Sequence, residues 1–78
     1  MNSEIDKEVD EAVRRVLEKY NPNGFDLALY ADFYTEITMS MKDKSGIQNR
    51  YGYAYSVARN LIKAVLANKL MTAIKTIK

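Results

Sequence analysis

Apolar residues recur every three or four positions from residue 3 to residue 20. This spacing places them on one side of an amphipathic helix, and the set is Ile5, Val9, Ala12, Val13, Val16, Leu17 and Tyr20. Ser3 stands where an N-cap belongs, and acidic residues fill the first turns, where the helix dipole favours them. The run Asn-Pro-Asn-Gly at 21–24 then ends the helix, since proline disfavours helical geometry in the residue before it. We therefore predict a helix over 3–20 followed by a turn.

A second helix is predicted over 26–42. Asp26 is its expected N-cap, and Phe25 precedes it as the hydrophobic staple. Its apolar positions form an unbroken i, i+4 row made by Leu29, Phe33, Ile37 and Met41.

Part of this segment also alternates as a strand would, which leaves a β-hairpin over 35–57 as an alternative. Ile37, Met39 and Met41 alternate with polar residues, and Tyr51, Tyr53 and Tyr55 alternate with small ones. The two arms would turn at 42–46. The longer i, i+4 row favours the helix.

The widest apolar stripe follows, over 53–78, where nothing breaks a helix. A helix of this length measures about 39 Å, more than the core of a small domain covers. Its far end carries Leu66, Leu70, Ile74 and Ile77, which predicts a homodimer joined through the C-terminal helix. Together these patterns predict an all-α fold, a small three- to four-helix domain occupying 1–78.

Composition argues against catalysis and against a metal site. The 78 residues include no Cys and no His, so disulfides and the usual zinc ligands are excluded, and we expect no enzyme and no cofactor. Glu4, Glu8 and Glu11 share one helix side, but the basic residues beside them indicate an exposed surface. The N-terminus is polar and acidic, and no apolar run reaches the roughly 18 residues of a membrane span. We expect a single cytoplasmic domain.

Charge is divided along the chain. Residues 1–41 hold nine acids and four bases, a net charge of −5, whereas residues 42–78 hold eight bases and one acid, a net charge of +7. A basic segment of this kind binds a polyanion, an acidic protein, or the acidic half of its own or a neighbouring copy.

Residues 45–63 fit a helix-turn-helix unit, in which a short helix and a recognition helix meet around a tight turn. Gly52 is the expected turn residue, because such a turn commonly needs glycine. The positions that must then be buried are all apolar or aromatic: Ile47, Tyr51, Tyr53, Ala58 and Leu61.

The same alignment turns a polar set outward on the recognition helix: Ala54, Tyr55, Ser56, Arg59, Asn60 and Lys63. Arg59 suits a guanine edge and Asn60 an adenine edge, while Ser56, Tyr55 or Lys63 suits phosphate. Arg50 would complete one exposed basic patch with Arg59 and Lys63. We expect double-stranded DNA as the partner.

Within this stretch the run Ile47-Gln48-Asn49-Arg50-Tyr51, followed by Tyr55, Ala58 and Leu61-Ile62, resembles the C-terminal DNA-binding domain of the bacterial translocase FtsK. That domain is a winged helix, and the resemblance covers about 16 residues and implies a reader of double-stranded DNA. It supports the motif class rather than membership of that family.

The expected function is a small DNA-binding regulator of transcription or architectural factor, of the size used by phages, plasmids and viruses. One alternative is a non-enzymatic interaction module on a helical bundle, such as an inhibitor that binds an acidic protein. In that case 45–63 is only a loop and the start of a core helix. A third interpretation lays the basic segment 57–78 on an anionic membrane.

Overall fold

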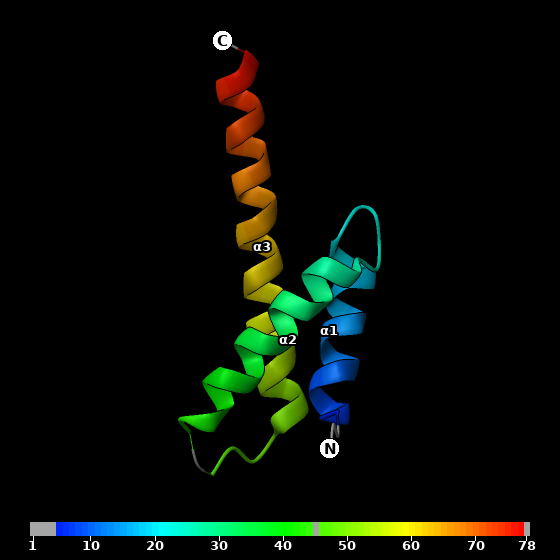
Figure 1. Ribbon diagram of the computed structural model, residues 1–78, viewed down its shortest axis with the longest axis vertical. Coiled ribbons are helices and arrows are strands. Elements are labelled where there is room, and N and C mark those ends of the chain that lie inside the picture. The colour runs from blue at the N-terminus through cyan, green and yellow to red at the C-terminus, as the bar shows by residue number, and fades with distance from the viewer. Residues whose placement is uncertain (1–4, 45, 78) are drawn as a thin grey trace.

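The computed structural model describes residues 5–44 and 46–77, with side chains as far as residue 69. It contains three helices, α1 (Lys7–Tyr20), α2 (Leu27–Lys42) and α3 (Arg50–Ile77) (Figure 1). No strand occurs in this part of the chain. The predicted all-α class is confirmed, and the alternative hairpin over 35–57 is wrong.

Helix α1 begins later than the predicted residue 3. Asp6 is its N-cap, and one carboxylate oxygen accepts hydrogen bonds from the backbone nitrogens of Glu8, at 3.2 Å, and Val9, at 3.4 Å. A capping carboxylate in extended geometry satisfies amides that the first turn leaves free. Ser3, the predicted cap, lies outside the described residues.

The predicted turn after α1 is present and is closed by a buried side chain. Asn21 is 6% exposed, and its amide nitrogen donates to the carbonyl oxygen of Gly24 at 2.7 Å. Gly24 returns a backbone bond to the carbonyl of Asn21 at 2.9 Å and has a φ of 76°. This region of φ is open to glycine at little cost, so the sequence locates the turn correctly.

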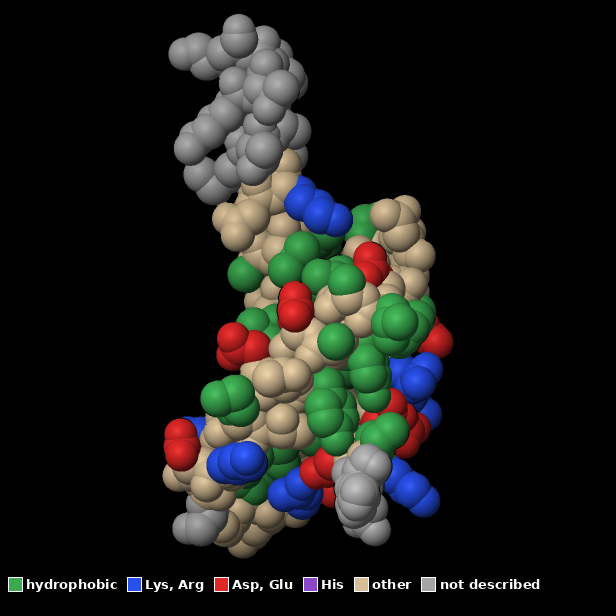
Figure 2. Space-filling model, in the orientation of Figure 1, with side chains coloured by type: hydrophobic (Ala, Val, Ile, Leu, Met, Phe, Trp, Pro, Cys, Tyr) green, Lys and Arg blue, Asp and Glu red, His purple; other side chains and the backbone are tan. Residues whose placement is uncertain are grey.

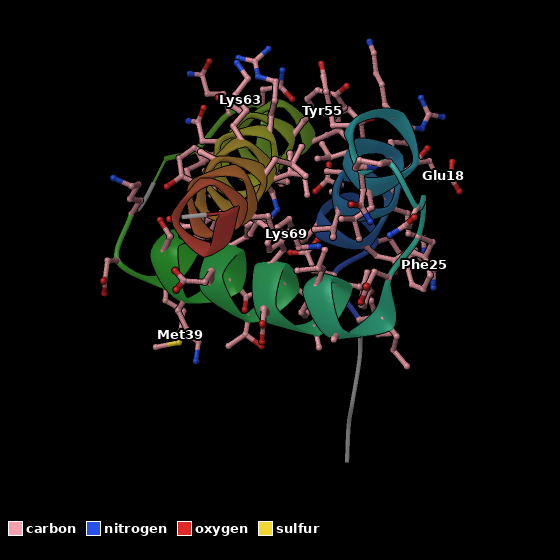
Figure 3. All side chains as sticks on the ribbon, turned by 90° about the horizontal axis from the view of Figure 1, so that it is seen from above. Glu18, Phe25, Met39, Tyr55, Lys63 and Lys69 are labelled. Carbon is pink, nitrogen blue, oxygen red and sulfur yellow. The ribbon has the colours of Figure 1, made fainter. Side chains whose placement is uncertain are left out.

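Helix α2 begins as its local sequence predicts. The carboxylate of Asp26 accepts from the backbone nitrogen of Leu29 at 3.1 Å, and the ring of Phe25 lies 5.6 Å from that of Tyr30, the staple position. Phe33, Ile37 and Met41 of the predicted row are buried, and Leu29 packs against them. Met39 is 61% exposed and points away from the bundle in Figure 3, as a helix requires and the rejected strand would not allow.

The start of α3 differs from the prediction. Gly52 was expected in a tight turn between two helices, but it lies inside the first turn of one continuous helix and is not among the glycines of positive φ. Asn49 starts that helix: its side-chain oxygen accepts from the nitrogen of Gly52 at 2.8 Å, and its carbonyl accepts from Tyr53 at 3.0 Å. The chain reverses earlier, where Gly46 has a φ of 80°.

The core lies where the three helices meet. Helix α1 runs beside the first half of α3, and α2 crosses both on one side (Figures 1 and 3). The buried residues are Val9, Ala12, Val13, Val16, Leu17, Phe33, Ile37, Met41, Ala54, Ala58 and Ile62. All five positions that the helix-turn-helix pattern requires to be apolar contact this core, although only Ala58 is fully buried.

Helix α3 continues beyond the other two helices (Figure 1). Its 28 residues correspond to about 42 Å, and the molecule is 47 Å long. The side chains of Leu70, Ile74 and Ile77, on which the dimer prediction rests, lie outside the described part of the chain. The face that α1 and α3 form together, away from α2, is where the candidate site lies.

Candidate nucleic-acid interface

All six predicted DNA-binding residues lie in the first half of α3, with Arg50 as its first residue. Ser56, Asn60 and Lys63 are exposed there, and Tyr55 and Arg59 are half-buried. Figure 3 shows Tyr55 and Lys63 on the side of the molecule away from α2. Ala54 was also expected to point outward, but it is fully buried in the core, so its predicted orientation is wrong.

Arg50 is separated from the other predicted basic residues by its own ion pairs. Its Nε lies 3.0 Å from the Glu8 carboxylate, and its Nη2 contacts the Asp6 carboxylate. The hydrogen bond that Arg50 donates to Asp6, followed by the charge of Asp6 and the hydrogen bond and charge of Glu8, raises the pKa of Arg50. The predicted basic patch is therefore not free as a whole. Arg50 is paired with the acidic start of α1, which leaves Arg59 and Lys63.

Two adjoining hollows lie on this face, one along the start of α3 and one between α1 and α3, and two tyrosines of α3 border both. A hollow of about 460 Å³ is lined by Asn49, Tyr51, Gly52, Tyr55, Ser56 and Arg59. A second, of about 580 Å³, is lined by Arg15, Glu18, Lys19, Tyr51 and Tyr55. Tyr51 and Tyr55 border both hollows, with ring centroids 5.9 Å apart. We refer to this surface, lined by Arg15, Lys19, Tyr51, Tyr55 and Arg59, as the α1–α3 groove.

The α1 side of this groove was missed at the level of sequence. Arg15 and Lys19 are one helical turn apart, and both reach the hollow that Tyr51 and Tyr55 share. Arg15 also pairs with Glu11 at 2.9 Å, and the Lys19 ammonium lies 5.5 Å from the ring centroid of Tyr20. The i, i+4 spacing of the two bases was a usable signal, but α1 belongs to the acidic half of the chain by net charge.

Two hydroxyls and a guanidinium meet beside the groove. The hydrogen bond between the hydroxyls of Tyr20 and Tyr55 lowers the pKa of Tyr20 and raises that of Tyr55. The positive charge of Lys19, and then a hydrogen bond from Arg59 and its charge, lower the pKa of Tyr20 further. The Nε of Arg59 is buried and has no hydrogen-bond partner among the described residues. A half-buried guanidinium beside phenolic hydroxyls, next to an open hollow, is suited to an anionic oxygen ligand.

The opposite face of the molecule has a different character. Figure 2 shows α2 at the front, with acidic, basic and apolar side chains interspersed and no concentration of one charge. Asp32 and Glu36 are exposed on this helix. A polyanion therefore has less electrostatic reason to bind there than on the α1–α3 face.

Comparisons of this chain with known protein families, with curated proteins and with solved structures find no match. The resemblance to the FtsK domain therefore stays a prediction. Within residues 5–44 and 46–77, no helix is both long and apolar enough to cross a membrane. In the same residues no group of three or more acidic side chains is placed to hold a metal ion.

Proposed function

We propose that this protein binds double-stranded DNA with the exposed face of α3, centred on Arg59 and Lys63. The observation that carries the proposal is the placement of these two bases. They are one turn apart, share their helix face with Ser56 and Asn60, and form no ion pair with a carboxylate of the described residues. Unpaired charge on one helix face is available to phosphate, whereas paired charge is not.

The residues of this face divide into those that suit the DNA phosphates, which position the protein, and those that suit base edges, which recognise sequence. An α-helix fits the major groove, where arginine pairs with guanine and asparagine with adenine. Arg59 and Asn60 are the residues of that type, and Ser56, Tyr55 and Lys63 suit phosphate oxygens. No turn at Gly52 is required, because the residues are carried by the first half of a single helix. A small regulator of transcription or an architectural factor acting on cytoplasmic DNA fits this arrangement.

The test is a titration of fluorescent duplexes by anisotropy at several salt concentrations. Lys63→Gln should weaken all duplexes alike and lower the salt slope by about one unit, since one phosphate contact is lost. Lys42→Gln, which removes an exposed lysine from the end of α2, is the matched control and should change neither quantity. Binding of the parent protein weaker than millimolar at low salt would end the proposal.

A homodimer joined through the C-terminal end of α3 is part of the same proposal. It is supported by the helix continuing past α1 and α2, and by the apolar repeat Leu66, Leu70, Ile74 and Ile77 in the sequence. A two-fold dimer would present two α3 faces to two half-sites. Light scattering at micromolar concentration should give twice the mass of the chain, and a monomer would contradict the dimer without affecting the DNA-binding face.

A second candidate function is an interaction module that binds an acidic protein through the same groove. The half-buried rings of Tyr51 and Tyr55, which border both hollows, favour it because tyrosine and arginine are enriched at protein interfaces. The salt titration separates the two functions. Only DNA binding gives a duplex affinity that falls steeply with salt, with a slope set by the number of phosphates contacted.

A further inference from the structure

Helix α1 lies alongside the half of α3 that carries the DNA-binding face. Both helices turn a side away from α2, and the α1–α3 groove lies between them (Figure 3). The exposed edge of α1 therefore belongs to the same face as Lys63, although the sequence assigns α1 to the acidic half. The part of the DNA that this edge of α1 contacts, when α3 is bound, follows from the spacing of the two helices and the width of the major groove.

Packed helices lie about 8–10 Å apart, and the major groove of DNA is about 12 Å wide, so it admits one helix. When α3 occupies the groove, its neighbour α1 stands over the phosphate strand that borders it. Resting on the proposed function, we infer that α1 binds this phosphate strand, with Lys19 as the phosphate-binding residue and Glu18 as a charge that opposes it.

The charges along α1 single out Lys19 for this role. Arg15 is partly neutralised by Glu11, at 2.9 Å, whereas Lys19 is exposed and makes no ion pair with a carboxylate that the structure describes. Its ammonium is held near the ring of Tyr20, on the side of the α1–α3 groove. A lysine in this position adds a phosphate contact that α3 alone does not supply.

Glu18 provides a test of opposite sign. It lines the same hollow as Lys19 and is exposed, so it brings a negative charge to the edge that would face phosphate. A residue that only supports the fold has no reason to improve binding when it is neutralised. A residue beside a phosphate strand does, because like charges within a Debye length of about 10 Å repel.

The experiment compares two matched pairs of exposed residues in the duplex titration. Lys19→Gln should weaken binding roughly five- to tenfold near 0.1 M salt and lower the salt slope by about one unit, while Lys42→Gln on α2 leaves both unchanged. Glu18→Gln should tighten binding about two- to fivefold, while Glu36→Gln, also exposed on α2, has no effect. Circular dichroism melting of all four variants shows that the fold is retained.

The outcomes separate the inference from the proposed function. If Lys63→Gln lowers the affinity and the salt slope but Lys19→Gln behaves like Lys42→Gln, then α3 binds DNA and the inferred role of α1 is wrong. If Glu18→Gln tightens binding no more than Glu36→Gln, α1 does not face the phosphates. If the parent protein does not bind duplex DNA at all, both the proposed function and the inferred role of α1 are wrong.

Discussion

An arginine–tyrosine cluster lies on each long side of α1, and the two clusters differ in whether a carboxylate accepts their hydrogen bonds. Toward α2, Arg14 donates to the Asp10 carboxylate at 3.0 Å and lies 5.2 Å from the ring centroids of both Phe25 and Tyr30. The hydroxyl of Tyr30 donates to the same carboxylate. We call this set the α1–α2 cluster.

Toward α3, Arg59 lies beside the hydroxyls of Tyr20 and Tyr55 with its Nε buried and unpartnered. Open hollows adjoin this second cluster, and no carboxylate of the described residues pairs with Arg59. Similar side chains thus have two uses. The α1–α2 cluster contains a carboxylate acceptor and contributes to stability, whereas the cluster around Arg59 has no carboxylate of the described residues and adjoins an open hollow that a ligand can enter.

The largest effect expected from this difference is on stability. Asp10→Ala should lower the free energy of unfolding by about 1–2 kcal/mol, because the Tyr30 hydroxyl and the Arg14 guanidinium both lose their acceptor. Arg59→Met keeps the apolar stem and removes a guanidinium that, among the described residues, has no carboxylate partner and hydrogen-bonds only to the Tyr20 hydroxyl, so it should change stability by less than about 0.5 kcal/mol. Urea unfolding followed by circular dichroism measures both, and equal losses would contradict the comparison.

Alkaline pH should weaken the α1–α2 cluster in a defined window. Burial, followed by the hydrogen bond to Asp10, raises the pKa of Tyr30 from 10.0 to about 12. The unfolded chain therefore releases this proton first, and the stabilisation is complete below pH 10 and lost as pH rises toward 12. Unfolding curves from pH 9 to 12 should show the advantage of the parent over Tyr30→Phe shrinking across that window. A constant difference would mean that the Tyr30 proton is not held by the fold.

The smallest effect concerns the ion pairs that hold Arg50. Glu8→Gln removes one of its two partners and one negative charge near the DNA-binding face. Duplex affinity should rise about two- to threefold, while the melting temperature hardly changes, because exposed ion pairs add little to stability. Glu36→Gln is again the control. Weaker binding by Glu8→Gln would show that the ion pair positions Arg50 for DNA rather than withholding it.

The sequence located a helix start or a turn correctly wherever only one residue in that stretch was suited to cap or to turn the chain. Asp26 and Phe25 located the start of α2, and Asn21 with Gly24 located the turn before it. The start of α3 had two competing signals: Gly52 resembles a turn residue, but Asn49 caps the helix three residues earlier. Side-chain capping decided the outcome, since glycine at the second or third helical position is tolerated.

Ion pairs between residues far apart in the chain could not be predicted from the sequence. The partners of Arg50 are 42 and 44 residues away, and they meet it only because α1 packs on α3. Net charge by segment also concealed how α1 divides its charges between faces, with Asp10 and Arg14 toward α2 and Lys19 toward α3. Ser56, Asn60 and Lys63 are exposed as predicted, because they lie three or four residues apart on one helix face, whereas Ala54 of the same predicted set faces the core.

The continuity of α3 has a consequence for geometry at long range. The residues proposed to read DNA and the end that projects from the bundle belong to one straight rod from Arg50 to Ile77, with no break between them. Docking the first half on a base sequence would therefore fix both the direction and the rotational phase of the second half. A partner bound at that end would therefore be held at one fixed distance and one fixed angle from the DNA site.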